Sequence, residues 1–201
     1  AGMQDCQIVV SNSLDEFLIE SLLSQGAQID SLGVGENLVT SKSSPVFGGV
    51  YKLCAVIKDG EIIPKIKVSE NIEKVTNPGM KNLYRIYDKE SGMALGDIMT
   101  LVDETLDPSQ DLTIYHQMNY WKNKTIPKGS YELRDLLVPI FIDGQLVYDC
   151  PSLAEIRAYS EKELSHLWDE VKRFTYPQTY YVDLSRKLLD LKMKMLEEVP
   201  K

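Results

Sequence analysis

The sequence predicts an α/β fold that has a mainly antiparallel, β-rich middle and a helical end. Three observations support this prediction. A strand, an amphipathic helix and a second strand follow one another near the start, three hairpin patterns come next, and helical periodicity returns after the last hairpin. The expected parts are an α/β segment over residues 1–43, a β-rich segment over residues 44–150 and C-terminal helices over residues 151–201.

Composition narrows the class of protein. The hydrophobic fraction of 43% and the charged fraction of 26% are those of an ordinary globular protein, and the net charge of -8 argues against nucleic acid or an anionic membrane as a partner. We see no apolar run long enough for a membrane span and no signal-peptide pattern. The three widely spaced cysteines, Cys6, Cys54 and Cys150, fit reduced thiols. These features predict a cytoplasmic protein.

The first segment has the pattern of a βαβ unit. Residues 7–10 and 29–32 are short apolar runs that predict strands. Between them, Ser13 and Glu16 have the spacing of a capping box, and Gly26 stands where a helix commonly ends. Because strand, helix and strand follow so closely, we expect the two strands to be parallel.

The middle segment has the pattern of successive hairpins. Apolar and β-branched runs flank short turn sequences rich in Asp, Ser and Gly. The turns are predicted at Asp59-Gly60, Ser91-Gly92 and Asp143-Gly144. Residues 44–150 are therefore expected to form mostly antiparallel strands and loops.

The last segment is predicted to be helical. Ser152 and Glu155 form a second capping-box pattern, which opens a helix expected to reach about Phe174. Pro177 interrupts the pattern. A final helix is marked by an apolar stripe that predicts packing: Leu184, Leu188, Leu191 and Met195.

The turn Gly33-Val34-Gly35 follows the second strand directly. A third glycine at position 38 would suggest a dinucleotide fingerprint, but that residue is Leu38, and no Gly-Lys-Ser/Thr follows as in a P-loop. On its own, the turn is either a structural corner or an anion cradle, since glycine lets backbone N–H groups approach a ligand closely.

The end of the first strand favours the cradle. Ser11, Asn12 and Ser13 also place small polar residues before a helix start. In a parallel sheet, both turns lie at the carboxyl edge of neighbouring strands. Two such ends, with free N–H groups and hydroxyls, predict a phosphate site formed by Ser11, Asn12, Ser13, Gly33, Val34 and Gly35.

Catalytic and metal-binding candidates are scarce. His116 and His166 have no partners at metal-ligand spacing, and we interpret both as surface or packing residues. A basic cluster is either a solvated strand and loop or a second anion contact, with Lys74 and Lys81 as the candidates for that contact. Its members are Lys65, Lys67, Lys74, Lys81 and Arg85. The residues alone therefore predict a phosphate-type ligand, no metal site and no catalyst.

Several segments in order resemble the C-terminal half of the nicotinate phosphoribosyltransferase family. They are "IVVSNSLDE", "IDSLGVGENLVTS", "PVFGGVYKL", "KIKVSENIEKVTNPGMK" and "YELRDLLVPIF". The resemblance runs over nearly all 201 residues. It implies the C-terminal part of an irregular (β/α) barrel of the type II phosphoribosyltransferase kind, followed by part of a β-rich domain.

The resemblance also implies a reaction. The family condenses nicotinate with phosphoribosyl pyrophosphate, with coupled ATP hydrolysis and Mg²⁺, to give nicotinate mononucleotide and pyrophosphate in NAD salvage. It implies a cytoplasmic homodimer classed with ligases and glycosyltransferases of pyridine nucleotide biosynthesis. By matching position, Ser11-Asn12 and Gly33-Val34-Gly35 would hold the ribosyl 5′-phosphate.

Two departures from the family's pattern matter. The family commonly has threonine after Gly-x-Gly, whereas this chain has Glu36, which we expect to face solvent and serve the helix start. The family's phosphorylated histidine and nicotinate-binding arginine lie upstream of the matched segment, and a single βαβ unit cannot close an eight-stranded barrel. We therefore expect a fragment that is catalytically incomplete alone. A stand-alone phosphate- or nucleotide-binding module and a dimerisation module remain the alternatives.

Overall fold

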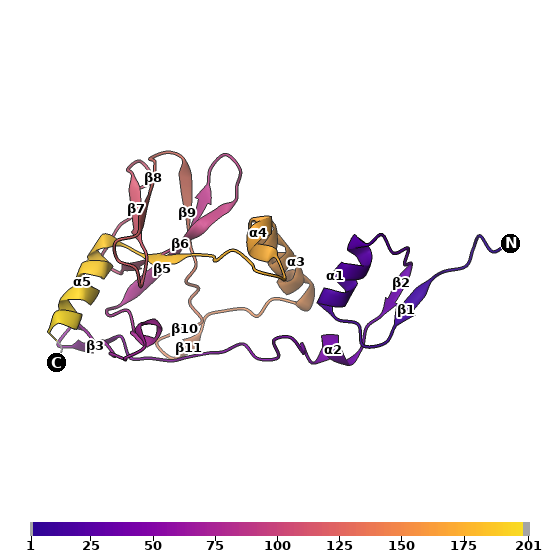
Figure 1. Ribbon diagram of the computed structural model, residues 1–201. Helices are drawn as coiled ribbons and strands as arrows, with labels where there is room; N and C mark the ends of the chain where they lie inside the picture. Colours follow the sequence, from indigo (N-terminus) through magenta and orange to yellow (C-terminus); the bar gives the residue numbers. More distant parts are fainter. Residues whose placement is uncertain (1, 199–201) are drawn as a thin grey trace. The chain divides into compact units, whose positions relative to one another are not determined.

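The computed structural model describes residues 2–198, which fall into two compact units (Figure 1). The first unit runs up to Tyr51 and the second begins at Lys52. The first unit holds the α/β elements, and the second holds the hairpins and the remaining helices.

The first unit is the predicted βαβ arrangement. Its elements are β1 (Val9–Ser11), α1 (Glu16–Ser24), β2 (Ser31–Gly33) and α2 (Glu36–Val39). Strands β1 and β2 pair in parallel, with Ser11 opposite Gly33. The predicted parallel pairing is therefore confirmed, although both strands begin about two residues later than the apolar runs indicated.

The predicted capping box at the start of α1 is wrong. The N-cap is Asp15, whose extended backbone lets its carboxylate accept from the Leu18 N–H at 2.8 Å. Ser13 has φ +50°, a left-handed conformation that does not lead into a helix. The predicted end is correct, because Gly26 follows the helix with φ +79°.

The second unit is built around one six-stranded sheet. Its first elements are β3 (Ala55–Lys58), β4 (Glu61–Pro64), the 3₁₀ helix η1 (Ile72–Lys74), β5 (Lys81–Asp88), β6 (Ala94–Leu101), β7 (Leu112–Tyr115), β8 (Asn123–Ile126) and β9 (Tyr131–Asp135). They are followed by β10 (Phe141–Ile142), β11 (Gln145–Leu146), α3 (Leu153–Ser165), α4 (Asp169–Lys172), β12 (Val182–Leu184) and α5 (Arg186–Glu197). The order across the sheet is β8-β7-β12-β6-β5-β9.

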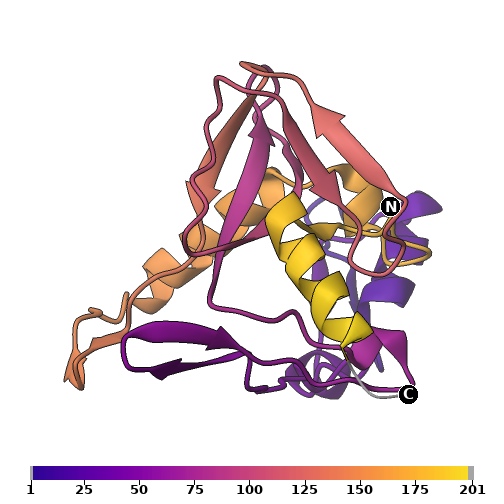
Figure 2. The ribbon, with the colours of Figure 1, turned by 90° about the vertical axis from the view of Figure 1, so that its left-hand side faces the viewer.

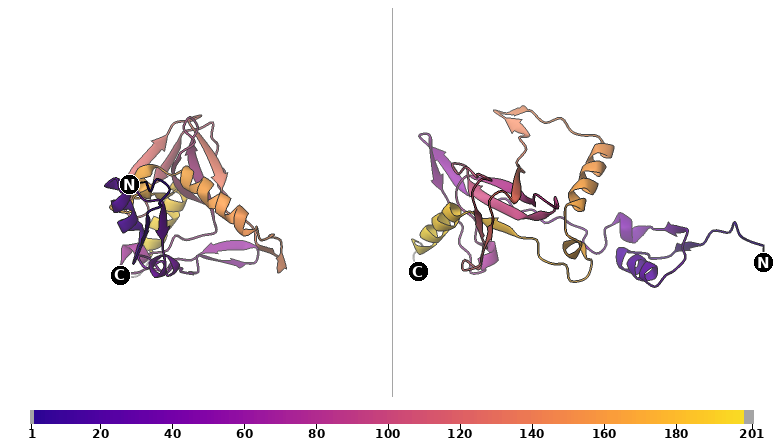
Figure 3. Two further views of the ribbon diagram at one scale, coloured as in Figure 1. Left: turned by 90° about the vertical axis from the view of Figure 1, so that its right-hand side faces the viewer. Right: turned by 90° about the horizontal axis from the view of Figure 1, so that it is seen from above.

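The three predicted hairpins are confirmed. β3 pairs with β4, β5 with β6 and β10 with β11, all antiparallel. The turn residues Asp59, Gly60, Asp143 and Gly144 all have positive φ, as a type I′ turn requires. The β10–β11 hairpin is a separate two-stranded sheet that stands apart from the six-stranded one (Figure 3).

The helical end differs from the prediction in two places. The expected helix to Phe174 is interrupted after Ser165, and the chain at Trp168 is extended before α4 begins. Leu184 belongs to a strand and not to the last helix, because β12 pairs in parallel with β6 and antiparallel with β7. Ser185 then caps α5 by accepting from the Leu188 N–H at 3.2 Å.

Two apolar clusters form the core of the second unit. One lies within the sheet and consists of Ile86, Ile98, Leu112, Ile114, Ile126 and Tyr131. The other joins β12 to α5 and consists of Leu184, Leu188 and Leu189. Figure 2 shows α5 lying against the sheet, where it contacts β6 and β7. Of the predicted stripe, Leu188 is buried and Leu191 and Met195 are partly buried, whereas the buried Leu189 was not predicted.

A network of ion pairs fixes α3 to the sheet. Arg85 on β5 contacts Asp97 at 2.9 Å and Glu163 of α3 at 3.0 Å, and Arg134 on β9 also pairs with Glu163. The Tyr180 hydroxyl donates to Asp97 at 2.7 Å. Hydrogen bonding to Asp97 raises the pKa of Arg85, and burial raises the pKa of Tyr180. The Arg85 guanidinium and the neutral Tyr180 hydroxyl are therefore both favoured as hydrogen-bond donors to Asp97.

Candidate functional site

The ends of β1 and β2 lie side by side, as the sequence predicted for a phosphate cradle. A Cβ built on Gly33 would lie 3.0 Å from the Ser11 Cβ, a tighter approach than side chains normally make. A side chain at position 33 would therefore require Ser11 to shift by a few tenths of an ångström.

The loops that follow these strands are also joined to each other. Asn12 and Ser13 both adopt left-handed conformations, with φ of +89° and +50°. The side-chain amide of Asn37 donates to the Ser13 carbonyl at 2.9 Å, which ties the start of α2 to the loop after β1. Ser11–Ser13 and Gly33–Gly35 thus meet at one edge of the two-stranded sheet.

The start of α2 leaves its first amides without a side-chain acceptor. Gly35 is the N-cap, and no side chain within residues 2–198 accepts a hydrogen bond there. A Cβ at Gly35 would meet nothing within 4 Å, so the space beside this backbone is open. The backbone here is accessible to an external acceptor such as a phosphate oxygen.

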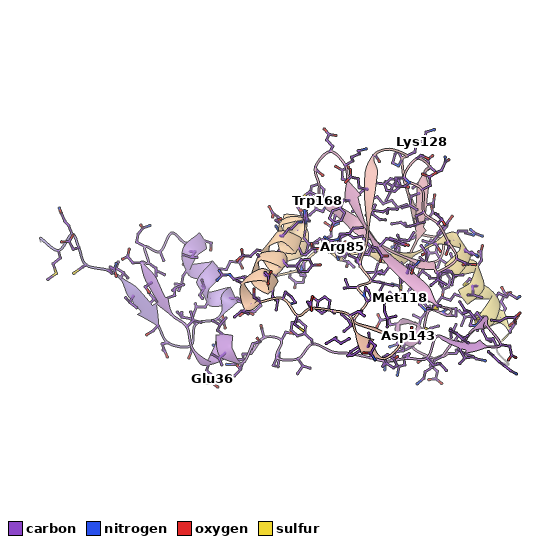
Figure 4. The ribbon with its side chains drawn as sticks, turned by 180° about the vertical axis from the view of Figure 1, so that it is seen from behind. Glu36, Arg85, Met118, Lys128, Asp143 and Trp168 are labelled. Atoms are coloured by element: carbon purple, nitrogen blue, oxygen red, sulfur yellow. The ribbon has the colours of Figure 1, made fainter. Side chains whose placement is uncertain are left out.

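Glu36 is exposed and begins α2. Figure 4 shows its side chain directed away from the body of the first unit. A first-turn carboxylate favours the positive end of a helix dipole. This orientation agrees with the expectation that Glu36 faces solvent.

The two lysines named as candidate anion contacts differ in their surroundings. Lys74 ends η1 and is exposed. The Lys81 ammonium is half-buried and donates to the carbonyl of Asn77 at 2.9 Å and to that of Gly79. Arg85, from the same basic cluster, is held by its two carboxylates. Two of the five basic residues, Lys81 and Arg85, therefore serve the protein's own structure, whereas Lys65, Lys67 and Lys74 are exposed.

The histidines lie in the second unit. His116 accepts at Nδ1 from the N–H groups of Met118 and Asn119, at 3.1 and 3.2 Å. The ring of His166 packs edge-on against Tyr87. Over residues 2–198, no group of three His, Cys, Asp or Glu side chains is placed to hold a metal ion. In the same part of the chain, no helix has the length and apolarity to cross a bilayer.

One cavity in the second unit was not predicted. It has a volume of about 530 Å³, and residues from β6, β7, β8, α4 and β12 line it. Its chemistry-bearing side chains include His116, Lys122, Lys124, Trp168, Tyr181 and Asp183. These residues are spread over almost 70 positions and share no local spacing, so no sequence motif could have indicated the cavity.

The fold is similar to a solved phosphoribosyltransferase. The crystal structure of human nicotinic acid phosphoribosyltransferase matches 96% of this chain with a TM-score of 0.66 and 29% sequence identity, and the match covers 33% of that structure. The mixed α/β architecture and the multi-stranded sheet are thus those of the C-terminal region of such an enzyme.

Sequence comparisons identify the family. The nicotinate phosphoribosyltransferase C-terminal domain matches residues 80–192. The chain is 39% identical over 199 residues to nicotinate phosphoribosyltransferase of Bacillus subtilis and 34% identical over 195 residues to that of Homo sapiens. It spans 40% and 33% of the length of these two relatives. The chain belongs to the nicotinate phosphoribosyltransferase family.

Proposed function

We propose that the chain works as the C-terminal part of a nicotinate phosphoribosyltransferase and supplies the cradle for the ribosyl 5′-phosphate. The whole enzyme would condense nicotinate with phosphoribosyl pyrophosphate, with coupled ATP hydrolysis and Mg²⁺, to nicotinate mononucleotide and pyrophosphate. We place it in the cytoplasm as a homodimer, in keeping with the family resemblance. The cradle would consist of Ser11, Asn12, Ser13, Gly33, Val34 and Gly35.

The close parallel pairing of Ser11 with Gly33 carries this proposal. It brings two loops of small residues to one sheet edge, and the bond between Asn37 and Ser13 holds the loops together. Hydroxyls from Ser11 and Ser13 and open backbone at Gly35 are the donors that phosphate oxygens accept from. Family membership makes the ribosyl phosphate the natural ligand for these donors.

The reaction explains why binding of the 5′-phosphate, away from the reacting carbon, is useful. Pyrophosphate leaves the anomeric carbon through a state with oxocarbenium character, so the enzyme mainly positions the reactants. Binding energy at the 5′-phosphate can hold the ribose in line for attack by the nicotinate nitrogen. The cradle would thus contribute orientation and not chemistry.

We also propose that the chain alone is catalytically incomplete. The first unit, which carries the strand-end loops, contains no histidine and no arginine in its sequence. An assay of the isolated chain with nicotinate, phosphoribosyl pyrophosphate and ATP should show only background turnover. A rate near 1 s⁻¹, which is ordinary for an enzyme, would contradict this.

A glycine substitution tests the cradle directly. Gly33→Ala introduces a Cβ 3.0 Å from that of Ser11, so Ser11 must shift by a few tenths of an ångström and the geometry of the strand-end loops changes. We expect calorimetry of phosphoribosyl pyrophosphate with the whole enzyme to show at least tenfold weaker binding. Gly48→Ala is the matched control, because its Cβ would meet nothing within 4 Å and it lies outside the loops. Equal affinity for the Gly33→Ala and Gly48→Ala proteins would exclude the cradle.

A further inference from the structure

The cavity in the second unit, here called the Asp183 cavity, contains a carboxylate without a hydrogen-bond donor. Asp183 lies on β12 with 8% of its surface exposed. Among the residues that the structure describes, no donor contacts its carboxylate, and the ionisable side chain nearest to it in effect is that of His116. The Asp183 oxygens are not sealed from solvent, so water in the cavity can hydrate them, and a ligand that displaces this water must supply hydrogen-bond donors in its place.

The position of Asp183 in the sheet explains why it faces the cavity. The next residue along β12, Leu184, enters the apolar cluster with α5. Successive side chains of a strand point to opposite faces, so Asp183 lies on the other face of the sheet. That face holds the cavity, which Asp183 lines.

His116 does not neutralise this carboxylate with a hydrogen bond. Its Nδ1 accepts from two backbone N–H groups, so Nδ1 has no proton and the neutral ring has its proton on Nε2. The ring lies edge-on to Tyr181, with 5.8 Å between ring centroids. His116 is thus oriented by the loop after β7 and leaves both Asp183 oxygens available.

The remaining walls suit a flat ring. Trp168 lines the cavity and is fixed by a bond of 3.1 Å from its Nε1 to the Ala94 carbonyl, and Tyr181 lies near by on the lining. Trp168 and Tyr181 each keep 43% of their surface exposed, so part of each aromatic residue remains accessible to a ligand. Figure 4 shows Trp168 at the end of α3 nearest the sheet.

Two cations lie on the same lining. Lys122 and Lys124 flank the start of β8, and both are exposed. Neither has an ion pair within residues 2–198. They would therefore attract an anionic group on a ligand whose ring occupies the cavity.

We propose that the Asp183 cavity binds a guanine-type nucleotide. A free carboxylate offers two acceptor oxygens, which match two adjacent N–H donors on one edge of a planar ring, as guanine has at N1 and N2. Adenine offers a donor beside an acceptor and would leave one oxygen facing a lone pair. The phosphate would lie toward Lys122 and Lys124. The volume of about 530 Å³ is within the range of small-molecule sites.

Titration with guanosine monophosphate tests the proposal on the full chain. Within residues 1–201, Trp121→Phe leaves Trp168 as the single indole, so the fluorescence of this 201-residue chain reports on the cavity. We expect guanosine monophosphate to quench the Trp168 fluorescence saturably and adenosine monophosphate to bind at least tenfold more weakly. The affinity for guanosine, which has no phosphate, should depend much less on salt concentration than the affinity for guanosine monophosphate. Absence of saturation with millimolar guanosine monophosphate, or equal affinity for the adenine nucleotide, would overturn the proposal.

Variants separate the base contact from the phosphate contact. Asp183→Asn keeps the volume but replaces one acceptor with a donor, so guanosine monophosphate should bind at least tenfold more weakly. Asp149→Asn is the matched control, because Asp149 is exposed and outside the cavity. Lys122→Gln with Lys124→Gln should weaken the nucleotide several-fold and leave guanosine unchanged. If the lysine variants lose binding while Asp183→Asn retains it, the phosphate binds at the surface only and the proposal fails.

Discussion

The two units bury their apolar residues to very different extents. In the first unit, Leu14 is the one fully buried hydrophobic side chain among the described residues up to Tyr51, and Phe47 and Tyr51 are completely exposed. In the second unit, Ile86, Ile98, Leu184 and Leu188 have no exposed surface. The loops proposed to hold phosphate thus belong to a unit with little core of its own, whereas the second unit has a core that stabilises it.

The largest expected effect is on the core of the second unit. Ile98→Ala removes a fully buried side chain from β6 and should lower the free energy of unfolding by about 2–5 kcal/mol. Val9→Ala, on β1 of the first unit, is the matched control, because Val9 is 63% exposed. Urea denaturation followed by circular dichroism measures both. If the two substitutions lower the free energy of unfolding equally, the two units do not differ in how much buried apolar side chains stabilise them.

The next effect concerns the ion pairs that fix α3. Glu163→Gln removes the charge that pairs with Arg85 and Arg134, and should destabilise the second unit by about 1–3 kcal/mol. Glu161→Gln is its control, because the Glu161–Arg157 pair is exposed and should contribute under about 1 kcal/mol. An equal effect of the two substitutions would mean that the Glu163 network adds no more than a surface pair.

The ion pair between Glu163 and Arg134 should make the stability of the second unit fall as the pH is lowered. The hydrogen bond from Arg134 holds the pKa of Glu163 below its ordinary value of 4.5. The stabilisation is therefore fully present above about pH 4.5 and is lost as the pH falls through the lower folded-state pKa. The difference between wild type and Glu163→Gln should shrink below pH 4.5, whereas a constant difference would contradict the ionic origin.

Replacing Asp183 should change the stability of the second unit in the opposite direction to replacing Glu163. Burial raises the pKa of the Asp183 carboxyl above 3.8. Asp183→Asn should therefore stabilise the second unit at neutral pH by about 1 kcal/mol, the scale of an unpaired buried polar group. The gain should vanish below about pH 3.8, where the carboxyl is protonated in both states. Thermal melts of the Asp183→Asn and Asp149→Asn proteins measure this gain in stability. If Asp183→Asn is less stable than wild type, the carboxylate of Asp183 has a hydrogen-bond donor.

The smallest effect is expected at Glu36 in the first unit. Glu36→Thr removes only a first-turn dipole interaction of about 0.3–1 kcal/mol if the side chain faces solvent. The affinity of the whole enzyme for phosphoribosyl pyrophosphate, measured by calorimetry, should then change less than tenfold. A larger gain in affinity would show that Glu36 repels the phosphate, and a larger loss would show that it contacts the ribose or a metal ion.

Local patterns predicted the elements whose causes are local. The turns at Asp59-Gly60 and Asp143-Gly144 were predictable because positive φ selects such residues, and the capping box at Ser152 and Glu155 forms as expected. The cap of α1 was misplaced by two residues because left-handed backbone at Ser13 is not visible in residue type.

Elements that depend on distant partners were missed. Leu184 was assigned to a helix because its spacing from Leu188 and Leu191 is helical, but pairing with Met99 on β6 makes it part of a strand. The Asp183 cavity was missed for the same reason, since β12 brings Asp183 beside residues of β7 and β8. The loops after β1 and β2 were predictable as neighbours because a βαβ unit fixes its own pairing.

The central place of β12 has a consequence for how the protein is made. Residues 182–184 insert between β6 and β7, whose strands were synthesised more than 65 residues earlier. Until they emerge from the ribosome, the β7–β8 hairpin and the β5–β6–β9 group have no strand to join them. The facing edges of β6 and β7 therefore stay unpaired during synthesis, and unpaired strand edges promote aggregation. A chain that stops before residue 182 would leave both edges unpaired permanently.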